Sequence, residues 1–380
     1  DKMQEFLKNY GYPSKAYESN VMTENLENAG YILTDKVEDA AIAIVNTCSV
    51  TNTADSKSLK TLRQVKKNNP NIILIACGCL AQVNSKIIKE KTNADIIIGN
   101  IGKSKIVDII KNYLRDKNSI EDIKDIMHSS FETMQLNNFD KTRAFVKIQD
   151  GCNNFCSYCI IPYTRGNVRS KPKDDVIKEV KELIKSGHQE IVLAGIHTGH
   201  YGSEFKDYDF ADLLNELVKI DGLLRLRISS IEIVELNDKF LEVLKNNKVL
   251  VDHLHIPLQS GSDPILKAMN RRYNLEYYEN KIKEIRKIRP NISISTDVIV
   301  GFPGETKELF EETIATVKRL QFSKIHVFPY SRRKGTKADL MPNQVDEHEK
   351  KERARILIEV SKELEIAYMT KFINTEVSFI

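Results

Sequence analysis

The chain has 380 residues, of which 41% are hydrophobic and 29% charged, a balance typical of soluble globular proteins that excludes a mainly disordered chain. The length predicts two or three domains. A net charge of +4 is too small to indicate a polyanionic partner by itself. No apolar run of about 18 residues is present, and the first residues carry no signal-peptide pattern, so we expect a cytoplasmic protein without a membrane span.

Short apolar runs alternate with helical patterns through the first part of the chain, which predicts βαβ units and a parallel sheet. The apolar runs are 40–47, 71–78 and 94–100, and the helical stretches are 17–30, 53–69, 80–92 and 103–114. We therefore expect an N-terminal α/β domain over 1–115, followed by a polar linker with a short helix over 116–140.

A second alternating series follows and predicts a partial or full (β/α) barrel. Its strands are expected at 144–149, 190–195, 224–230, 253–259, 292–301 and 324–330, and its helices at 174–187, 209–219, 238–246, 263–270, 275–288, 306–320 and 345–371. This second domain is expected over 141–371, and residues 372–380 resemble the first strand of a further domain.

Three of the six cysteines, Cys152, Cys156 and Cys159, form a C-x3-C-x2-C triplet after the first strand of the second series. Three thiols cannot all pair as disulfides, and structural zinc usually takes four ligands. Three thiolates suit a cubane [4Fe-4S] cluster with one iron left open. Zinc with a distant fourth ligand, such as a histidine, remains the alternative.

The triplet resembles that of the radical SAM superfamily, and other segments extend the resemblance to the methylthiotransferases, in particular the type that acts on threonylcarbamoyladenosine in bacterial tRNA (the MtaB type). These segments are 147–171, 255–274, 296–306 and 326–336. The resemblance implies a flavodoxin-like N-terminal domain, a radical SAM partial barrel, and an RNA-binding TRAM barrel that is absent or truncated in this chain.

The resemblance also implies that S-adenosylmethionine binds the open iron and is cleaved to a radical that abstracts an unactivated hydrogen. It assigns cofactor contacts to Tyr158, Gly195, Ser230, Glu232, Gln259 and Ser260. A core tyrosine, and turn residues at strand ends, remain the alternative interpretation of these positions.

The family carries a second [4Fe-4S] cluster on three N-terminal cysteines, to which Cys48 and Cys79 correspond by resemblance. The first cysteine is missing, because the register set by Gly11 and Tyr17 places Tyr12 there. Cys77, two residues before Cys79, is a possible replacement ligand if both side chains share one face, or else a small buried residue of the third strand.

Basic residues gather near the expected substrate mouth and are expected to contact tRNA phosphates. They are Arg165, Arg169, Lys171, Arg271, Arg272, Arg332, Arg333 and Lys334. The expected reaction adds a methylthio group to C2 of threonylcarbamoyladenosine at position 37, in the tRNA anticodon stem-loop. It requires an electron donor such as flavodoxin or ferredoxin, and a sulfur donor that the sequence does not identify. The alternatives are the isopentenyladenosine enzyme (the MiaB type) and a tRNA-binding remnant with a defective second cluster.

Overall fold

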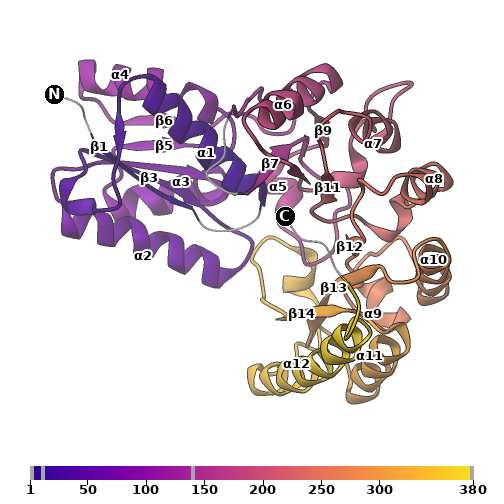
Figure 1. Ribbon diagram of the computed structural model, residues 1–380. Helices are drawn as coiled ribbons and strands as arrows, with labels where there is room; N and C mark the ends of the chain where they lie inside the picture. The colour runs from indigo at the N-terminus through magenta and orange to yellow at the C-terminus, as the bar shows by residue number, and fades with distance from the viewer. Residues whose placement is uncertain (1–3, 10–12, 138–141, 377–380) are drawn as a thin grey trace. The chain divides into compact units, whose positions relative to one another are not determined.

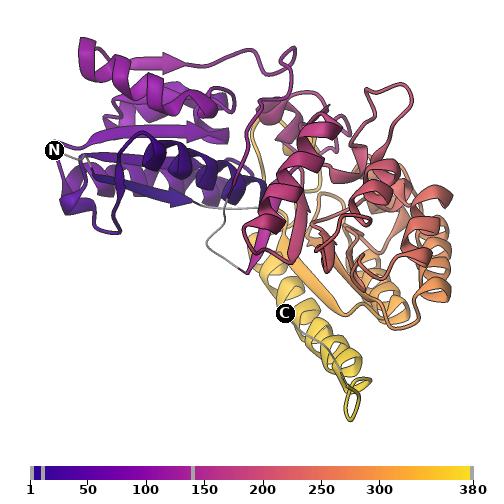
Figure 2. The same cartoon turned by 45° about the horizontal axis from the view of Figure 1, so that its top comes forward.

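The computed structural model describes residues 4–9, 13–137 and 142–376. The chain forms two compact units, which are considered separately (Figures 1 and 2). Unit 1 comprises Asp1–Asn154, Ile160–Ser186 and Ala194–Ile196, and unit 2 comprises Phe155–Cys159, Gly187–Leu193 and His197–Ile380.

The first unit contains a parallel sheet whose described strands run in the order β2-β1-β3-β4-β5-β6. The strands are β1 (Gln4–Asn9), β2 (Ile32–Leu33), β3 (Ile42–Thr47), β4 (Ile73–Gly78), β5 (Ile96–Ile98) and β6 (Ile120–Asp122). An order beginning 2-1-3-4-5 is that of flavodoxin-like folds, which bind ligands at the carboxyl edge where the order reverses. The prediction of a flavodoxin-like sheet is confirmed.

Helices cover both faces of this sheet (Figure 1). On one face, α2 (Asn52–Asn68) and α3 (Cys79–Thr92) pack Leu62 and Ile88 against Val45. On the other, α1 (Pro13–Asn28) and α4 (Ile106–Asp116) pack against the opposite side chains of the same strands. Strands buried on both faces explain the nearly continuous apolar runs in the sequence, such as the fully buried β3.

One expectation for the connecting segment is wrong. A linker with a short helix was expected over 116–140, but the described part of that segment contributes β6, which pairs with β5 as an edge strand. A strand of three residues is too short for periodicity to reveal. The first unit continues with β7 (Arg143–Lys147), β8 (Gln149–Asp150), α5 (Ile161–Arg165), β9 (Arg169–Ser170) and α6 (Lys173–Lys185).

The second unit repeats strands and helices along the chain. Its strands are β10 (Glu190–Ala194, the last residue of which belongs to the first unit), β11 (Arg225–Ile228), β12 (His253–His255), β13 (Ser293–Val300) and β14 (Lys324–Pro329). Its helices are α7 (Phe210–Leu217), α8 (Asp238–Asn246), α9 (Asp263–Ala268), α10 (Leu275–Ile288), α11 (Lys307–Leu320) and α12 (Glu347–Thr370).

Pairing within the second unit is parallel, between β10 and β11 and along β12-β13-β14, as the predicted partial (β/α) barrel requires. The predicted α/β class is therefore confirmed. None of the helices in the described ranges combines the length and apolar composition that a membrane crossing needs. The domain limits at 115, 140 and 371 remain a prediction.

Candidate functional site

Two cysteines lie at the carboxyl edge of the first sheet. Cys48 follows β3, where its N–H donates to the Ser58 hydroxyl at 3.1 Å. Cys79 begins α3 directly after Gly78, whose φ is +96° and whose Cβ, if present, would lie 2.5 Å from Asn46 Oδ1. Only glycine therefore permits the tight turn that places Cys79 at this edge. Both thiols are buried, at 7% and 2% exposure.

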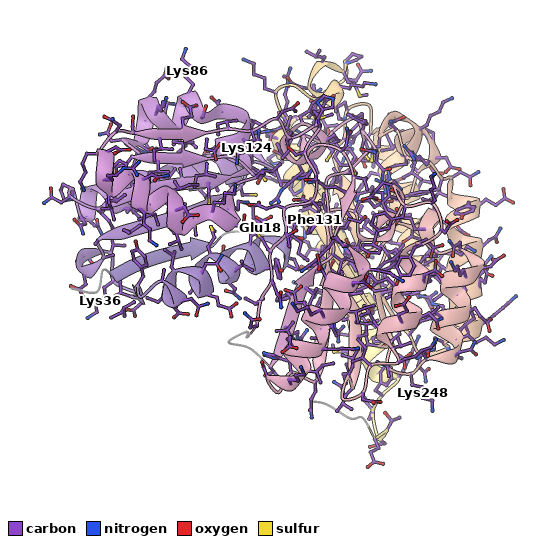
Figure 3. All side chains as sticks on the ribbon, turned by 90° about the horizontal axis from the view of Figure 1, so that it is seen from above. Glu18, Lys36, Lys86, Lys124, Phe131 and Lys248 are labelled. Carbon is purple, nitrogen blue, oxygen red and sulfur yellow. The ribbon has the colours of Figure 1, made fainter. Side chains whose placement is uncertain are left out.

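A buried ion network lies in the same unit and consists of Glu18, Lys103, Lys147, Asp150 and Arg165 (the Glu18 network). Glu18 is labelled in Figure 3 and is fully buried. Its carboxylate lies 2.5 Å from Lys103 Nζ, 2.6 Å from Lys147 Nζ and 2.5 Å from Arg165 Nη1. Burial raises the pKa of the Glu18 carboxyl, but the surrounding cations outweigh burial and hold its pKa well below the usual range.

Asp150 completes this network from the strand before the cysteine triplet. It accepts from Lys147 Nζ at 2.7 Å and lies 3.3 Å from Arg165 Nη1. Lys147 also lies over the Phe131 ring, 5.8 Å from its centroid. The network therefore ties α1 to β7, β8 and α5, and the segments that carry it are among those on which the family resemblance depends.

A lysine ammonium also lies near the two N-terminal thiols. Lys15 is 2% exposed and its Nζ donates to the backbone carbonyl of Thr47, the residue before Cys48. Burial lowers the pKa of Lys15, and Cys79 and Cys48 oppose that effect. Burial raises the pKa of the Cys79 thiol, but Arg165, Lys15 and Lys103 outweigh burial and bring it below the ordinary value. This edge of the sheet therefore favours an anion.

The described residues do not fit a three-thiolate cubane at this edge. Tyr12, at the position of the missing cysteine, lies outside the described residues. Cys77 is fully buried in the core with Ile44, Ile75 and Ile98, and burial raises the pKa of its thiol to about 11. The structure thus supports the core interpretation of Cys77, because the turn at Gly78 interrupts the extended alternation that the replacement-ligand idea assumed.

The cysteine triplet lies in the irregular segment that follows β8, and its three cysteines are partly exposed. The Cys152 N–H donates to the Gly166 carbonyl at 3.0 Å, and the Cys159 N–H donates to the Cys156 carbonyl at 2.9 Å. Arg271 Nη1 donates to Cys156 Sγ at 3.3 Å. Partly accessible thiols in one short loop, with a guanidinium donor to one sulfur, fit a three-thiolate cluster.

Two of the predicted cofactor contacts lie beside this loop in the second unit. Arg271 also pairs with the Glu232 carboxylate, so one guanidinium joins Glu232 to Cys156. Tyr158 is half-buried, and its ring meets Phe302 edge-on with centroids 6.4 Å apart. Tyr158 therefore packs on the core, and burial raises the pKa of its hydroxyl well above the usual value.

The other predicted contacts differ in accessibility. Gln259 has a φ of +68° and accepts from the Ile299 N–H at 2.8 Å, which places a strained residue at a strand end. Ser260 is fully buried, and its hydroxyl accepts from the Ser262 N–H at 3.3 Å. Ser230 and Gly195 are partly exposed. Ser260 is thus already engaged within the protein, whereas Gln259, Ser230 and Gly195 are partly accessible.

Several of the basic residues expected to contact tRNA are buried instead, and that expectation is wrong for them. Arg165 is 1% exposed in the Glu18 network, Arg169 is 6% exposed and lies 3.3 Å from Asp150, and Lys171 pairs with Glu179 at 2.5 Å. Burial with a carboxylate partner satisfies each charge internally, so a phosphate cannot reach it. Arg271 and Arg333 are also largely buried. Arg272, Arg332 and Lys334 are exposed.

Sequence reasoning missed a second cluster of ionisable residues, formed by His197, His200 and Glu235 in the second unit. The two histidines three residues apart, directly after a predicted strand, were a visible signal. Their partner Glu235 follows a different strand, and only the fold brings it to them. Sequence reasoning missed the Glu18 network for the same reason, since its members come from four distant segments.

Comparisons with known proteins agree with this architecture. The radical SAM superfamily matches residues 146–317, and the uncharacterized protein family UPF0004 matches residues 4–99. A Bacillus subtilis protein named threonylcarbamoyladenosine tRNA methylthiotransferase MtaB is 42% identical over 94% of this chain and 80% of its own length. A Thermotoga maritima protein of the same name is 37% identical over 97% of this chain and 84% of its own length. A Clostridium perfringens protein named tRNA-2-methylthio-N(6)-dimethylallyladenosine synthase is 36% identical over 94% of this chain and 82% of its own length.

Solved structures of radical SAM enzymes share the fold. The methyltransferase TsrM from Kitasatospora setae superposes with a TM-score of 0.62 at 13% identity, covering 86% of this chain and 73% of that one. The radical enzyme OxsB superposes with a TM-score of 0.59 at 11% identity, covering 90% of this chain and 54% of that one. Parallel β/α repeats with a cysteine triplet after an early strand define a radical SAM enzyme. Given the relatives above, the chain belongs to the radical SAM methylthiotransferase family.

Proposed function

We propose that this enzyme adds a methylthio group to C2 of threonylcarbamoyladenosine at position 37, next to the anticodon of tRNA. The observation that carries the proposal is the set of three relatives named for this reaction, which are 37–42% identical over 91–97% of the chain. Relatives named for the dimethylallyladenosine reaction reach 38% identity, so the isopentenyl substrate is the closest rival. A tRNA substrate supports the further proposal of a cytoplasmic enzyme.

The proposed ligands of the radical SAM cluster are Cys152, Cys156 and Cys159, which lie in one loop and are partly exposed. These three cysteines would hold a [4Fe-4S] cluster, which would supply the electron that cleaves S-adenosylmethionine. Arg271 holds a positive charge against Cys156 Sγ and keeps the Glu232 carboxylate in place.

We propose the same six residues as contacts to S-adenosylmethionine, with different roles for the accessible and the buried ones. Gln259, Ser230 and Gly195 offer partly accessible backbone and side-chain groups at strand ends. Tyr158 presents an aromatic ring, and Glu232 is a carboxylate acceptor for hydroxyl or amino groups. Ser260, which is buried, would act by fixing the backbone of this loop.

The domain limits at 115, 140 and 371 and the RNA surface belong to the same proposal. Arg272, Arg332 and Lys334 are the exposed cations of the original set, and they are suited to phosphate contacts. An electron donor such as flavodoxin or ferredoxin would reduce the cluster.

The substrate is tested with the reconstituted enzyme, S-adenosylmethionine, a reductant, sulfide and tRNA. One tRNA carries threonylcarbamoyladenosine, a second carries isopentenyladenosine, and a third carries unmodified adenosine at position 37. Mass spectrometry of the digested nucleosides should show methylthio product only from the first tRNA. Product only from the second would replace the proposal with its rival.

A second function is favoured by one observation, the burial of Lys15 next to Cys48 and Cys79 where the third thiolate is missing. On this alternative the chain binds tRNA and cleaves S-adenosylmethionine, but does not insert sulfur. Iron analysis separates the two, since about eight irons per chain indicate two cubanes and about four indicate one.

Restoring the missing ligand extends this test. If the N-terminal site lacks only one thiolate, Tyr12→Cys should raise the iron content from about four toward about eight per chain. The matched control, Tyr31→Cys, adds a thiol elsewhere in the same unit and should leave the iron content unchanged. An iron content that stays at about four per chain in Tyr12→Cys, with no effect of Cys77→Ala, would show that position 12 is not at the cluster.

A further inference from the structure

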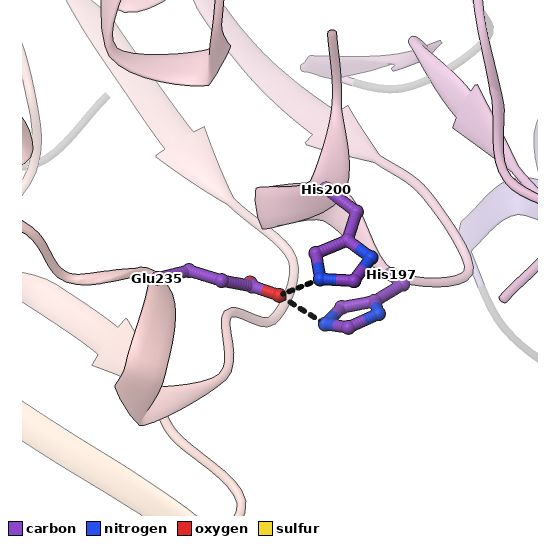
Figure 4. Close-up of side chains that lie close together, drawn as sticks. All are labelled: His197, His200 and Glu235. Atoms are coloured by element: carbon purple, nitrogen blue, oxygen red, sulfur yellow. Dashed lines mark ion pairs between the residues drawn. The ribbon is translucent and has the colours of Figure 1, made fainter. Parts of the chain in front are cut away.

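His197, His200 and Glu235 lie together after strands β10 and β11, and nothing in the proposed reaction uses them (Figure 4). His197 precedes the turn η3 (Thr198–His200) and His200 ends it. Glu235 ends the turn η4 (Ile233–Glu235). Both imidazole Nε2 atoms face one oxygen, Oε1 of Glu235. His197 pairs with it directly, and His200 Nε2 lies 3.3 Å from it. The three ligand atoms lie within 4.8 Å of one another.

The surrounding backbone holds this arrangement in place. A Cβ on Gly199 would lie 1.8 Å from Glu235 Oε2, so only glycine lets the loop pass this close to the carboxylate. The Glu232 N–H donates to that same Oε2 at 3.2 Å, which leaves Oε1 directed at the imidazoles. The two rings stack with centroids 3.8 Å apart and planes inclined by 25°. Outer hydrogen bonds of this kind orient metal-binding carboxylates.

The chemistry and burial of the three groups indicate their ligand. The side chains of His197 and Glu235 are 4% and 8% exposed, whereas that of His200 is 22% exposed and leaves a route from solvent. Two imidazoles and one carboxylate bind Zn²⁺ in catalytic sites and Fe²⁺ in non-haem enzymes, in both cases with positions left open. Mg²⁺ and Ca²⁺ prefer sites made of oxygen alone.

We propose that His197, His200 and Glu235 bind one divalent transition-metal ion of the Zn²⁺ or Fe²⁺ type, separate from the iron–sulfur chemistry. The site uses residues of the second unit alone, and it does not depend on which tRNA nucleoside is the substrate.

The test is a calorimetric titration of Zn²⁺ into the chain after iron–sulfur reconstitution, which occupies the cluster thiols. The wild type should bind one equivalent at this site. His200→Ala should weaken that equivalent by about 100-fold or more, because even loss of an outer partner costs roughly 10- to 100-fold. His128→Ala is the matched control, because His128 is an exposed histidine paired with Asp125. Equal Zn²⁺ binding by wild type and His200→Ala would overturn the proposal.

Binding of Co²⁺ to a cysteine variant adds a new absorption band, which a folding defect cannot produce. His200→Cys should give a sulfur-to-cobalt charge-transfer band on adding Co²⁺ to the reconstituted chain, and His128→Cys should not. Gly199→Ala changes no ligand, but should weaken Zn²⁺ binding because its methyl group displaces Glu235. A wild-type chain that binds no Zn²⁺, or a His200→Cys variant without the new band, would show that the cluster is only a hydrogen-bonded histidine–glutamate group.

Discussion

Removing the charge of Glu18 is the sharpest test of how the first unit is held together. Glu18→Gln keeps the size and shape of the side chain but leaves Lys103, Lys147 and Arg165 around a neutral amide. All three cations now lie 2.5–2.6 Å from the carboxylate, and Glu18 is fully buried. The net charge of the Glu18 network rises from +1 to +2 in a place that water does not reach.

The expected cost follows from that burial. Removing one partner of a buried ion pair typically costs 3–5 kcal/mol, because the remaining charge stays desolvated. With three cations sharing one carboxylate, and only Asp150 left to oppose them, we expect the free energy of unfolding to fall by about 3–5 kcal/mol. In a domain of ordinary stability, this is a large fraction of the total.

Denaturant unfolding measures this change, with circular dichroism as the signal. Asp125→Asn is the control, since Asp125 pairs with His128 on the surface and its loss should leave the free energy of unfolding nearly unchanged. Adding Lys103→Met to Glu18→Gln should recover part of the loss, because it removes one of the unpaired cations. A loss below about 1 kcal/mol in Glu18→Gln would refute the argument that the buried network holds this unit together.

Three further predictions concern pH, the cluster and RNA. The pKa of Glu18 in the folded chain is below its unfolded value of about 4.3. The stability that the Glu18 carboxylate contributes is therefore complete above about pH 4.3 and is lost as the pH falls below that value. Acid should accordingly destabilise the wild type more than it destabilises Glu18→Gln. Cys156→Ala should abolish both the iron–sulfur absorbance of the triplet site and cleavage of S-adenosylmethionine, whereas Cys77→Ala, which alters a core residue, should keep both; full cleavage by Cys156→Ala would contradict the ligand assignment. Arg272→Ala and Lys334→Ala should each weaken tRNA binding and reduce the slope of log binding constant against log salt concentration by about 1. Lys86→Ala, on the exposed face of α3 (Figure 3), should change neither quantity. The same slope in the wild type and in the two loop variants would exclude these loops as the RNA surface.

Local pattern was sufficient for much of the fold. The strands β3 and β4 and the helices α2 and α10 lie within a few residues of the ranges predicted from periodicity, because strands buried on both faces need continuous apolar runs and surface helices need an apolar stripe. The strand β6 was missed because three residues, none of them fully buried, carry no period.

The candidate site divides along the same line. The proposed ligands Cys152, Cys156 and Cys159 are close in sequence, so their spacing alone indicated them, whereas the missing cysteine at position 12 was inferred from the family resemblance. The fate of a charged side chain, in contrast, depends on what the fold brings to it. Arg165 and Arg332 both look like exposed loop cations in the sequence, but the tertiary structure buries Arg165 against Glu18, 147 residues away, and leaves Arg332 exposed.

The composition, the periodicity and the cysteine spacing by themselves determined the class of the protein: a parallel α/β chain with a three-cysteine loop after the first strand of its second series. Only the tertiary structure decided that Cys77 is a core residue, that Glu18 joins three cations, and that Glu235 meets two histidines. The physical reason is that backbone periodicity is a local property, whereas burial and charge pairing depend on which distant segments the fold places in contact.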